Sequence, residues 1–105
     1  MSTGDLGGLF QQAQKMQKEL KAVQEDLKQR TVMGESGSGL IKVYASGQQE
    51  VLKVEIDPEV VDPEDIEMLE DLGLVAVQQA LEKAKELSDQ ETSRVTGGMS
   101  FPGMA

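Results

Sequence analysis

The chain has 105 residues and a formal net charge of −9, with no cysteine, no histidine and no tryptophan. Without cysteine and histidine it lacks disulfides, thiolate and imidazole metal ligands, and the commonest general base. No apolar run approaches membrane-spanning length, and no basic segment leads into an apolar one at the N-terminus. The composition therefore predicts a single cytoplasmic domain with an aliphatic core, without a membrane segment, metal or cofactor.

The first predicted element is a helix over about residues 5–30. Apolar residues recur at alternating spacings of three and four from Leu6 to Leu27, which gives the helix a narrow apolar seam. Such a seam can pack on the sheet of its own chain, or it can also pair with another chain. About 25 helical residues span roughly 38 Å, whereas a compact domain of this size has a radius of gyration of about 13 Å. The helix is therefore expected to extend past its own core.

Three short strands are predicted between about residues 30 and 57. The β-prone run 31–33 precedes a glycine-rich loop at 34–39, and residues 40–46 and 50–56 then alternate between apolar and polar. Short turns between the strands favour an antiparallel meander. The loop lacks Gly-Lys-Ser/Thr and leads into a strand, which favours a simple connection over a phosphate-binding loop.

A second helix is predicted over about residues 63–91, followed by a flexible tail over about 93–105. Asp62 can cap its first turn, and Pro63 suits the first helical position. The turn at 74–77 is apolar all round, and a glycine before it favours close approach of another backbone. This segment is the expected interface of a homodimer, formed by Leu72, Gly73, Leu74, Val75 and Val77.

Charge is distributed unevenly along the chain. Residues 1–33 hold five basic and four acidic side chains, whereas residues 57–91 hold two basic and twelve acidic ones. The carboxylates at 57–65 lack EF-hand spacing, so helix capping and solvation explain them better than a cation site does. No nucleophile lies in a recognisable arrangement with a base. We therefore expect no catalytic residues, no small-molecule substrate and no enzymatic activity.

The lysines of the first helix lie on the side opposite the seam, given about 100° of rotation per residue. Such a face can be ordinary solvated surface, or it can bind the phosphates of a nucleic acid. The candidate DNA-binding residues are these four lysines, the arginine at the end of the helix, and the arginine near the C-terminus: Lys15, Lys18, Lys21, Lys28, Arg30 and Arg94.

Four segments and the Gly/Met-rich tail together resemble the YbaB/EbfC family of bacterial nucleoid-associated proteins over nearly the whole chain. The segments are residues 12–17, 34–43, 54–58 and 68–72. The resemblance implies an α+β fold of order α-β-β-β-α, with a three-stranded antiparallel sheet and two long helices. It also implies a homodimer with protruding helices that binds double-stranded DNA in the nucleoid, with effects on DNA conformation or gene regulation.

A second hypothesis is an acidic dimeric adaptor that binds a protein partner in replication, recombination or repair through its arms. Salt dependence separates the two hypotheses. Phosphate contacts weaken linearly with the logarithm of salt concentration, whereas an apolar contact hardly responds.

Overall fold

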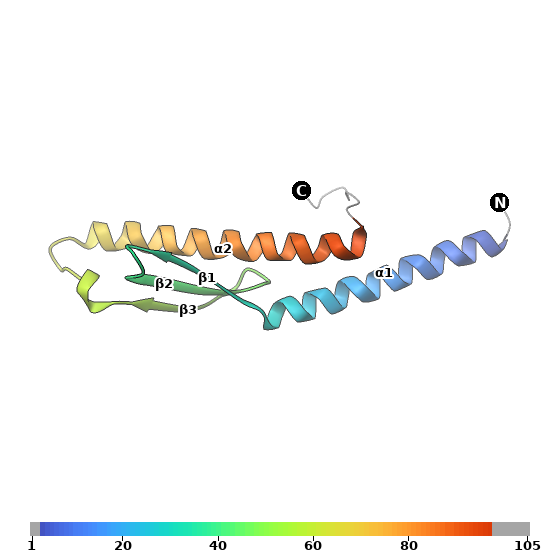
Figure 1. Ribbon diagram of the computed structural model, residues 1–105, viewed down its shortest axis with the longest axis horizontal. Coiled ribbons are helices and arrows are strands. Elements are labelled where there is room, and N and C mark those ends of the chain that lie inside the picture. The colour runs from blue at the N-terminus through green and yellow to red at the C-terminus, as the bar shows by residue number, and fades with distance from the viewer. Residues whose placement is uncertain (1–2, 98–105) are drawn as a thin grey trace.

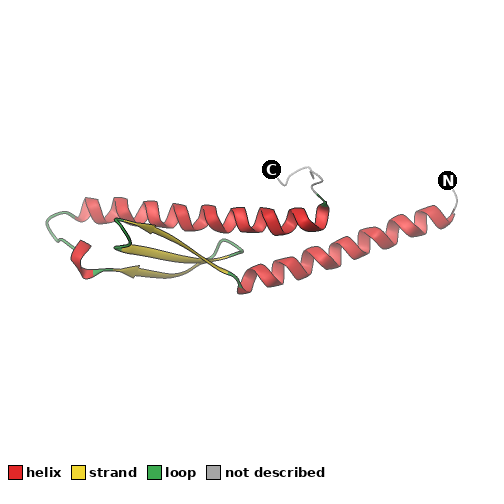
Figure 2. Cartoon of the chain, viewed as in Figure 1, coloured by secondary structure: helices red, strands yellow, loops and turns green. Residues whose placement is uncertain are grey.

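The computed structural model describes residues 3–97, and their side chains from residue 6 onward. The elements follow in the predicted α-β-β-β-α order (Figure 1; Figure 2). They are α1 (Thr3–Gln29), β1 (Thr31–Ser36), β2 (Ile41–Ser46), β3 (Val51–Ile56), a short 3-10 helix η1 (Pro58–Val60) and α2 (Ile66–Thr96). Residues 93–96, expected in the tail, are the last turn of α2. The remainder of the expected tail, from residue 98, lies outside the described residues.

The three strands form one antiparallel sheet in the order β1-β2-β3. Because β2 is central, its inward side chains are the most deeply buried. Ile41, Val43 and Ala45 alternate along β2 as the sequence predicts, and each is at most 1% exposed. They pack against a row of alanines on α2 at positions 76, 80 and 84. The small alanine side chains allow the helix to lie close to the sheet.

Gly34 lies inside β1, opposite Val43, and not in the loop predicted for residues 34–39. A Cβ atom on Gly34 would overlap the carbonyl oxygen of Ala76 and the backbone nitrogen of Ala80. The glycine is therefore required by the contact between strand and helix. The close backbone approach that the sequence suggested at Gly73 occurs here instead, since no atom lies within 4 Å of a Cβ built on Gly73.

The start of α2 corrects a second prediction. The helix begins at Ile66, and its cap is Asp65, whose carboxylate accepts a hydrogen bond from Met68 N at 3.2 Å. Asp62, the predicted cap, accepts from Glu64 N at 2.9 Å and closes a separate turn. A residue before proline is disfavoured in the helical region, so an Asp-Pro pair begins a new turn. That turn is not continued into the helix here.

The outer edge of β1 is occupied by side chains of α2. Gln79 Oε1 accepts a hydrogen bond from Glu35 N at 2.8 Å, and Lys83 Nζ donates to the carbonyl oxygen of Met33 at 2.9 Å. These contacts satisfy backbone groups that an edge strand otherwise leaves unpaired. They also place α2 over the β1 side of the sheet.

On the face of the sheet that α2 covers, the part formed by β3 is left exposed. Val54 and Ile56 of β3 lie opposite the buried Val43 and Ile41, yet they are 49% and 47% exposed. β3 is the strand farthest from α2 in Figure 1. Together with Leu52, which is also exposed, these side chains form an apolar surface that we call the β3 shelf (Leu52, Val54 and Ile56).

α1 projects from this body as an arm. Its last turn is fixed in the core by the fully buried Leu27, whose carbonyl oxygen accepts a hydrogen bond from Gly47 N at 2.9 Å. Met16, Leu20 and Val23 of the seam are partly buried. Toward the N-terminus the seam becomes exposed, and Leu6 and Leu9 are open to solvent. The molecule measures 74 × 23 × 16 Å with a radius of gyration of 19.9 Å, against about 13 Å for a compact domain. The predicted extension of the helix past its core is confirmed.

Candidate nucleic-acid interface

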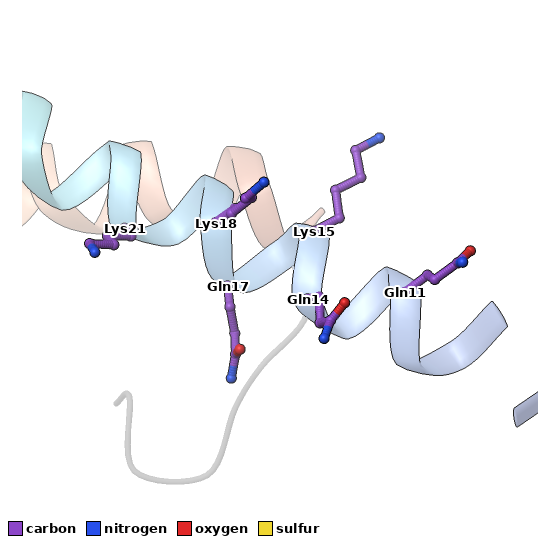
Figure 3. Close-up of a pocket in the computed structure, with 6 residues that line it drawn as sticks. All are labelled: Gln11, Gln14, Lys15, Gln17, Lys18 and Lys21. Carbon is purple, nitrogen blue, oxygen red and sulfur yellow. The ribbon is translucent and has the colours of Figure 1, made fainter. Parts of the chain in front are cut away.

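The exposed part of α1 carries a basic and amide-rich surface. Six residues of the helix line one shallow concavity along its side (Figure 3). In that view Lys15 and Lys18 project from one side of the helix and Gln17 projects from the other. We call this surface the lysine face, and it consists of Gln11, Gln14, Lys15, Gln17, Lys18 and Lys21. Lys28 is also exposed, in the last turn of α1.

The lysines of α1 are available for an external anion. Among the side chains that the structure describes, none of the four forms an ion pair. The two predicted arginines differ from them. Arg30 lies 3.3 Å from Asp26, and Arg94 lies 3.4 Å from Glu91 on α2. Both arginines are therefore partly neutralised by nearby carboxylates, Asp26 of α1 and Glu91 of α2, and the structure does not group them with the lysines.

The acidic residues gather at the other end of the molecule. Eight carboxylates and no basic residue lie between Asp57 and Asp71, in the segment that contains η1 and the start of α2. This segment and the free end of α1 lie at opposite ends of the long axis (Figure 1). Screening reduces interactions between exposed charges beyond about 8 Å at physiological salt. The negative charge of this segment therefore acts weakly on an anion bound at the arm.

The open face of the sheet has a second, smaller group of charges. Lys53 Nζ lies 2.9 Å from Glu55 Oε1 and 5.9 Å from the centre of the Tyr44 ring. The hydrogen bond from Lys53 lowers the pKa of Glu55, and the same contact raises the pKa of Lys53. Because these charges compensate one another, this face is a poorer anion site than the arm.

Neither a metal site nor a membrane span is found in the part of the chain that the structure describes. Within residues 3–97, no group of three or more acidic side chains is placed to hold a metal ion. No described helix combines the length and the apolar character needed to cross a bilayer.

The predicted dimer segment is only partly buried within the chain. Leu72 and Val77 pack against the edge of the core, whereas Leu74 and Val75 are 57% and 49% exposed. Leu74 and Val75 are thus left open to solvent in the single chain, and the expected dimer interface stays a prediction. Sequence reasoning also missed the glutamines of the lysine face, although the same helical period that groups the lysines would have included them.

The fold is that of a small α+β protein with a projecting helical arm that carries exposed lysines. The chain belongs to the YbaB/EbfC DNA-binding family, whose sequence pattern matches residues 2–99. This membership confirms the resemblance noted in the sequence and the predicted DNA-binding function.

Relatives cover almost the whole chain. A nucleoid-associated protein of Caldanaerobacter subterraneus is 47% identical over 100 residues, which are 95% of this chain and 90% of the relative. One from Pelotomaculum thermopropionicum is 44% identical over 104 residues, with 99% of each chain covered. The crystal structure of an uncharacterized protein from Helicobacter pylori matches with a TM-score of 0.75 at 25% identity, covering 92% of this chain and 99% of that one.

Proposed function

We propose that this protein binds double-stranded DNA through the lysine face of α1, as a homodimer in the cytoplasm and nucleoid. The observation that carries the proposal is the set of exposed lysines without ion pairs, on a helix that projects from the body and away from the acidic segment. Lysine contacts go mainly to phosphates, which carry no sequence information directly. Binding is therefore broad in sequence and strongly dependent on salt.

The β3 shelf supports the homodimer. The three side chains of the shelf remain about half exposed in the isolated chain, as does Val51 of the same strand. On α2, Ala76 and Ala80 face the core, and Gln79 lies on the side of the helix nearest β1. At about 100° per residue, Leu74 therefore lies on the flank toward β3, whereas Val75 shares the β1 flank with Gln79. A second copy seated on the shelf would also cover Leu74. We therefore place the proposed interface on the β3 side, with the shelf and Leu74, and leave Val75 outside it.

The proposed dimer would bring two arms to one DNA duplex. It presents two lysine faces, and two arms can hold one duplex with modest affinity from each. The protein acts by binding and shaping DNA, without catalysis and without a small-molecule substrate. The names of the two bacterial relatives, both nucleoid-associated proteins, support a place in the nucleoid.

A gel shift with duplex DNA across a salt series tests the proposal. If about four phosphates are neutralised by each arm, the logarithm of the binding constant falls with that of the salt concentration, at a slope of about −4 for one arm and about −7 for two. A complex that is insensitive to salt, or no complex with DNA, would favour the alternative of an adaptor for a protein partner. The exposed apolar shelf favours that alternative only if it remains uncovered in solution.

A further inference from the structure

Phe10 stands out among the apolar residues of α1. It is 70% exposed, the highest value among the large apolar side chains that the structure describes. The chain has only two phenylalanines and one tyrosine, and Tyr44 is half-buried on the sheet. In a chain with so few aromatic residues, a ring this exposed is best explained by contact with a partner outside the chain.

Phe10 does not belong to the apolar seam. The seam passes through Leu9, and one further residue turns the helix by about 100°. Phe10 instead begins a row with spacings of four, three, four and seven residues along the arm. That row is Phe10, Gln14, Gln17, Lys21 and Lys28. The ring therefore shares its side of the helix with part of the lysine face and with Lys28.

The surroundings of the ring are open. Gly7 precedes Phe10 by three residues, so it lies on the same side of the helix and bears no side chain there. No atom lies within 4 Å of a Cβ built on Gly7 or on Gly8. The helix backbone can therefore come close to a ligand at this end of the arm.

We propose that Phe10 is an apolar wedge that inserts at a base step of the DNA duplex held by the lysine face. This inference rests on the proposed function, because the lysines must first hold the duplex. Lys21 lies about 16 Å along the axis from Phe10, at 1.5 Å per residue. The lysines bind phosphates while the ring, farther along the same side, reaches the bases.

The wedge would convert binding into bending. Proteins that insert phenylalanine or leucine between base pairs partly unstack the step and kink the duplex by about 20–90°. Unstacking costs free energy, so the inserted ring adds little affinity on an intact duplex. A step that is already destabilised, such as a mismatch, lowers this cost and should be bound in preference.

The first test uses the absence of tryptophan from the chain. Phe10→Trp places a single fluorophore at the proposed wedge, and Leu9→Trp is the matched control on the seam. Stacking on bases should quench the emission of the Phe10→Trp variant at least about twofold when duplex DNA is added, while the emission of Leu9→Trp should hardly change. Equal responses from the two positions would overturn the assignment of Phe10 to the DNA side.

The second test measures bending by energy transfer between dyes at the two ends of a short duplex. Phe10→Ala should abolish the bend and the preference for a mismatched duplex, while affinity for the intact duplex falls less than about tenfold. Phe10→Trp should retain both properties. A Phe10→Ala complex that bends DNA like the wild type would overturn the wedge, as would dissociation of the protein into monomers by this change.

The two proposals fail differently. If wild-type protein gives no salt-sensitive complex with duplex DNA, the proposed function is wrong and the wedge falls with it. If the complex forms and depends on the lysines but the tryptophan at position 10 stays unquenched, the proposed function stands and only the wedge is wrong.

Discussion

Val43 and Val54 lie opposite each other in the β2–β3 pair and point to the same face of the sheet, yet Val43 is fully buried and Val54 is 49% exposed. The difference arises because α2 is held over β1 by Gln79 and Lys83. Burying apolar surface stabilises a protein by about 25 cal/mol for each Å². We therefore expect a second copy to gain stability by covering the β3 shelf.

The first prediction concerns the proposed dimer interface. Leu74→Asp should give monomers in light scattering at micromolar concentration, because a charge on the β3 flank would be desolvated by the partner. Val75→Asp is the matched control, with the same charge, similar exposure and a position on the other flank. It should remain dimeric. Neither side chain is in the core, so both variants should keep wild-type helicity; a wild-type monomer would contradict the interface.

The second prediction concerns the arm. Lys18→Glu, Lys21→Glu and Lys28→Glu together should abolish the gel shift with duplex DNA, because they replace phosphate-binding charges by repulsive ones. The dimer and its circular dichroism should not change, since all three side chains are exposed.

A matched control compares single charges. Lys21→Glu and Lys85→Glu change the net charge equally, but Lys85 lies on α2, which carries the excess of carboxylates. Lys21→Glu should weaken binding more than Lys85→Glu at the same salt concentration. Lys83 is unsuitable as a control because it bonds the edge of β1. Wild-type binding by the triple variant would show that the lysine face is not the contact surface.

The third prediction tests the contact between strand and helix. Gly34→Ala should lower the free energy of unfolding by about 2–3 kcal/mol, because the added methyl overlaps backbone atoms of α2 that have no room to move. Urea denaturation followed by circular dichroism measures the change. Gly8→Ala, in the open arm, should not lower stability and should raise helicity slightly. An equal effect of the two changes would refute this account of Gly34.

The fourth prediction concerns the open face of the sheet. Lys53→Met should raise the pKa of Glu55 toward its ordinary value, because the hydrogen bond and charge of Lys53 are the main causes that hold it low. Lys42→Met should raise it less, since Lys42 acts only through its charge. Carboxyl carbon chemical shifts followed by NMR through the acid range measure both.

The sign of the linked stability change follows from the direction of that shift. A carboxyl whose pKa is lowered on folding stabilises the fold above its unfolded pKa, and the contribution disappears as the pH falls through the folded value. The pair is exposed, so this contribution is small. The Lys53→Met variant should lose less stability on acidification than the wild type does.

The spacing of apolar and polar residues was enough to predict the alternation of Ile41, Val43 and Ala45. The helical rotation per residue likewise predicted the grouping of the lysines on α1. Both patterns depend only on neighbours along the chain. Gly34 was misplaced because the run Gly-Glu-Ser-Gly-Ser-Gly has the composition of a loop, and only the distant Ala76 and Ala80 make it a strand. The exposure of Val54 could not be predicted either. Alternation identifies the apolar side of a strand, but not which strands a helix will cover.

The hydrogen bonds from Gln79 and Lys83 to β1 have a consequence for assembly size. A sheet with two bare edges can add neighbours on both sides and so grow into fibres. Here one border is already occupied by the chain's own helix, and only the β3 side can accept another molecule. In an association about a twofold axis, both chains bury this same β3 side in the one interface. The proposed homodimer would therefore leave no bare sheet edge from which a longer polymer could start.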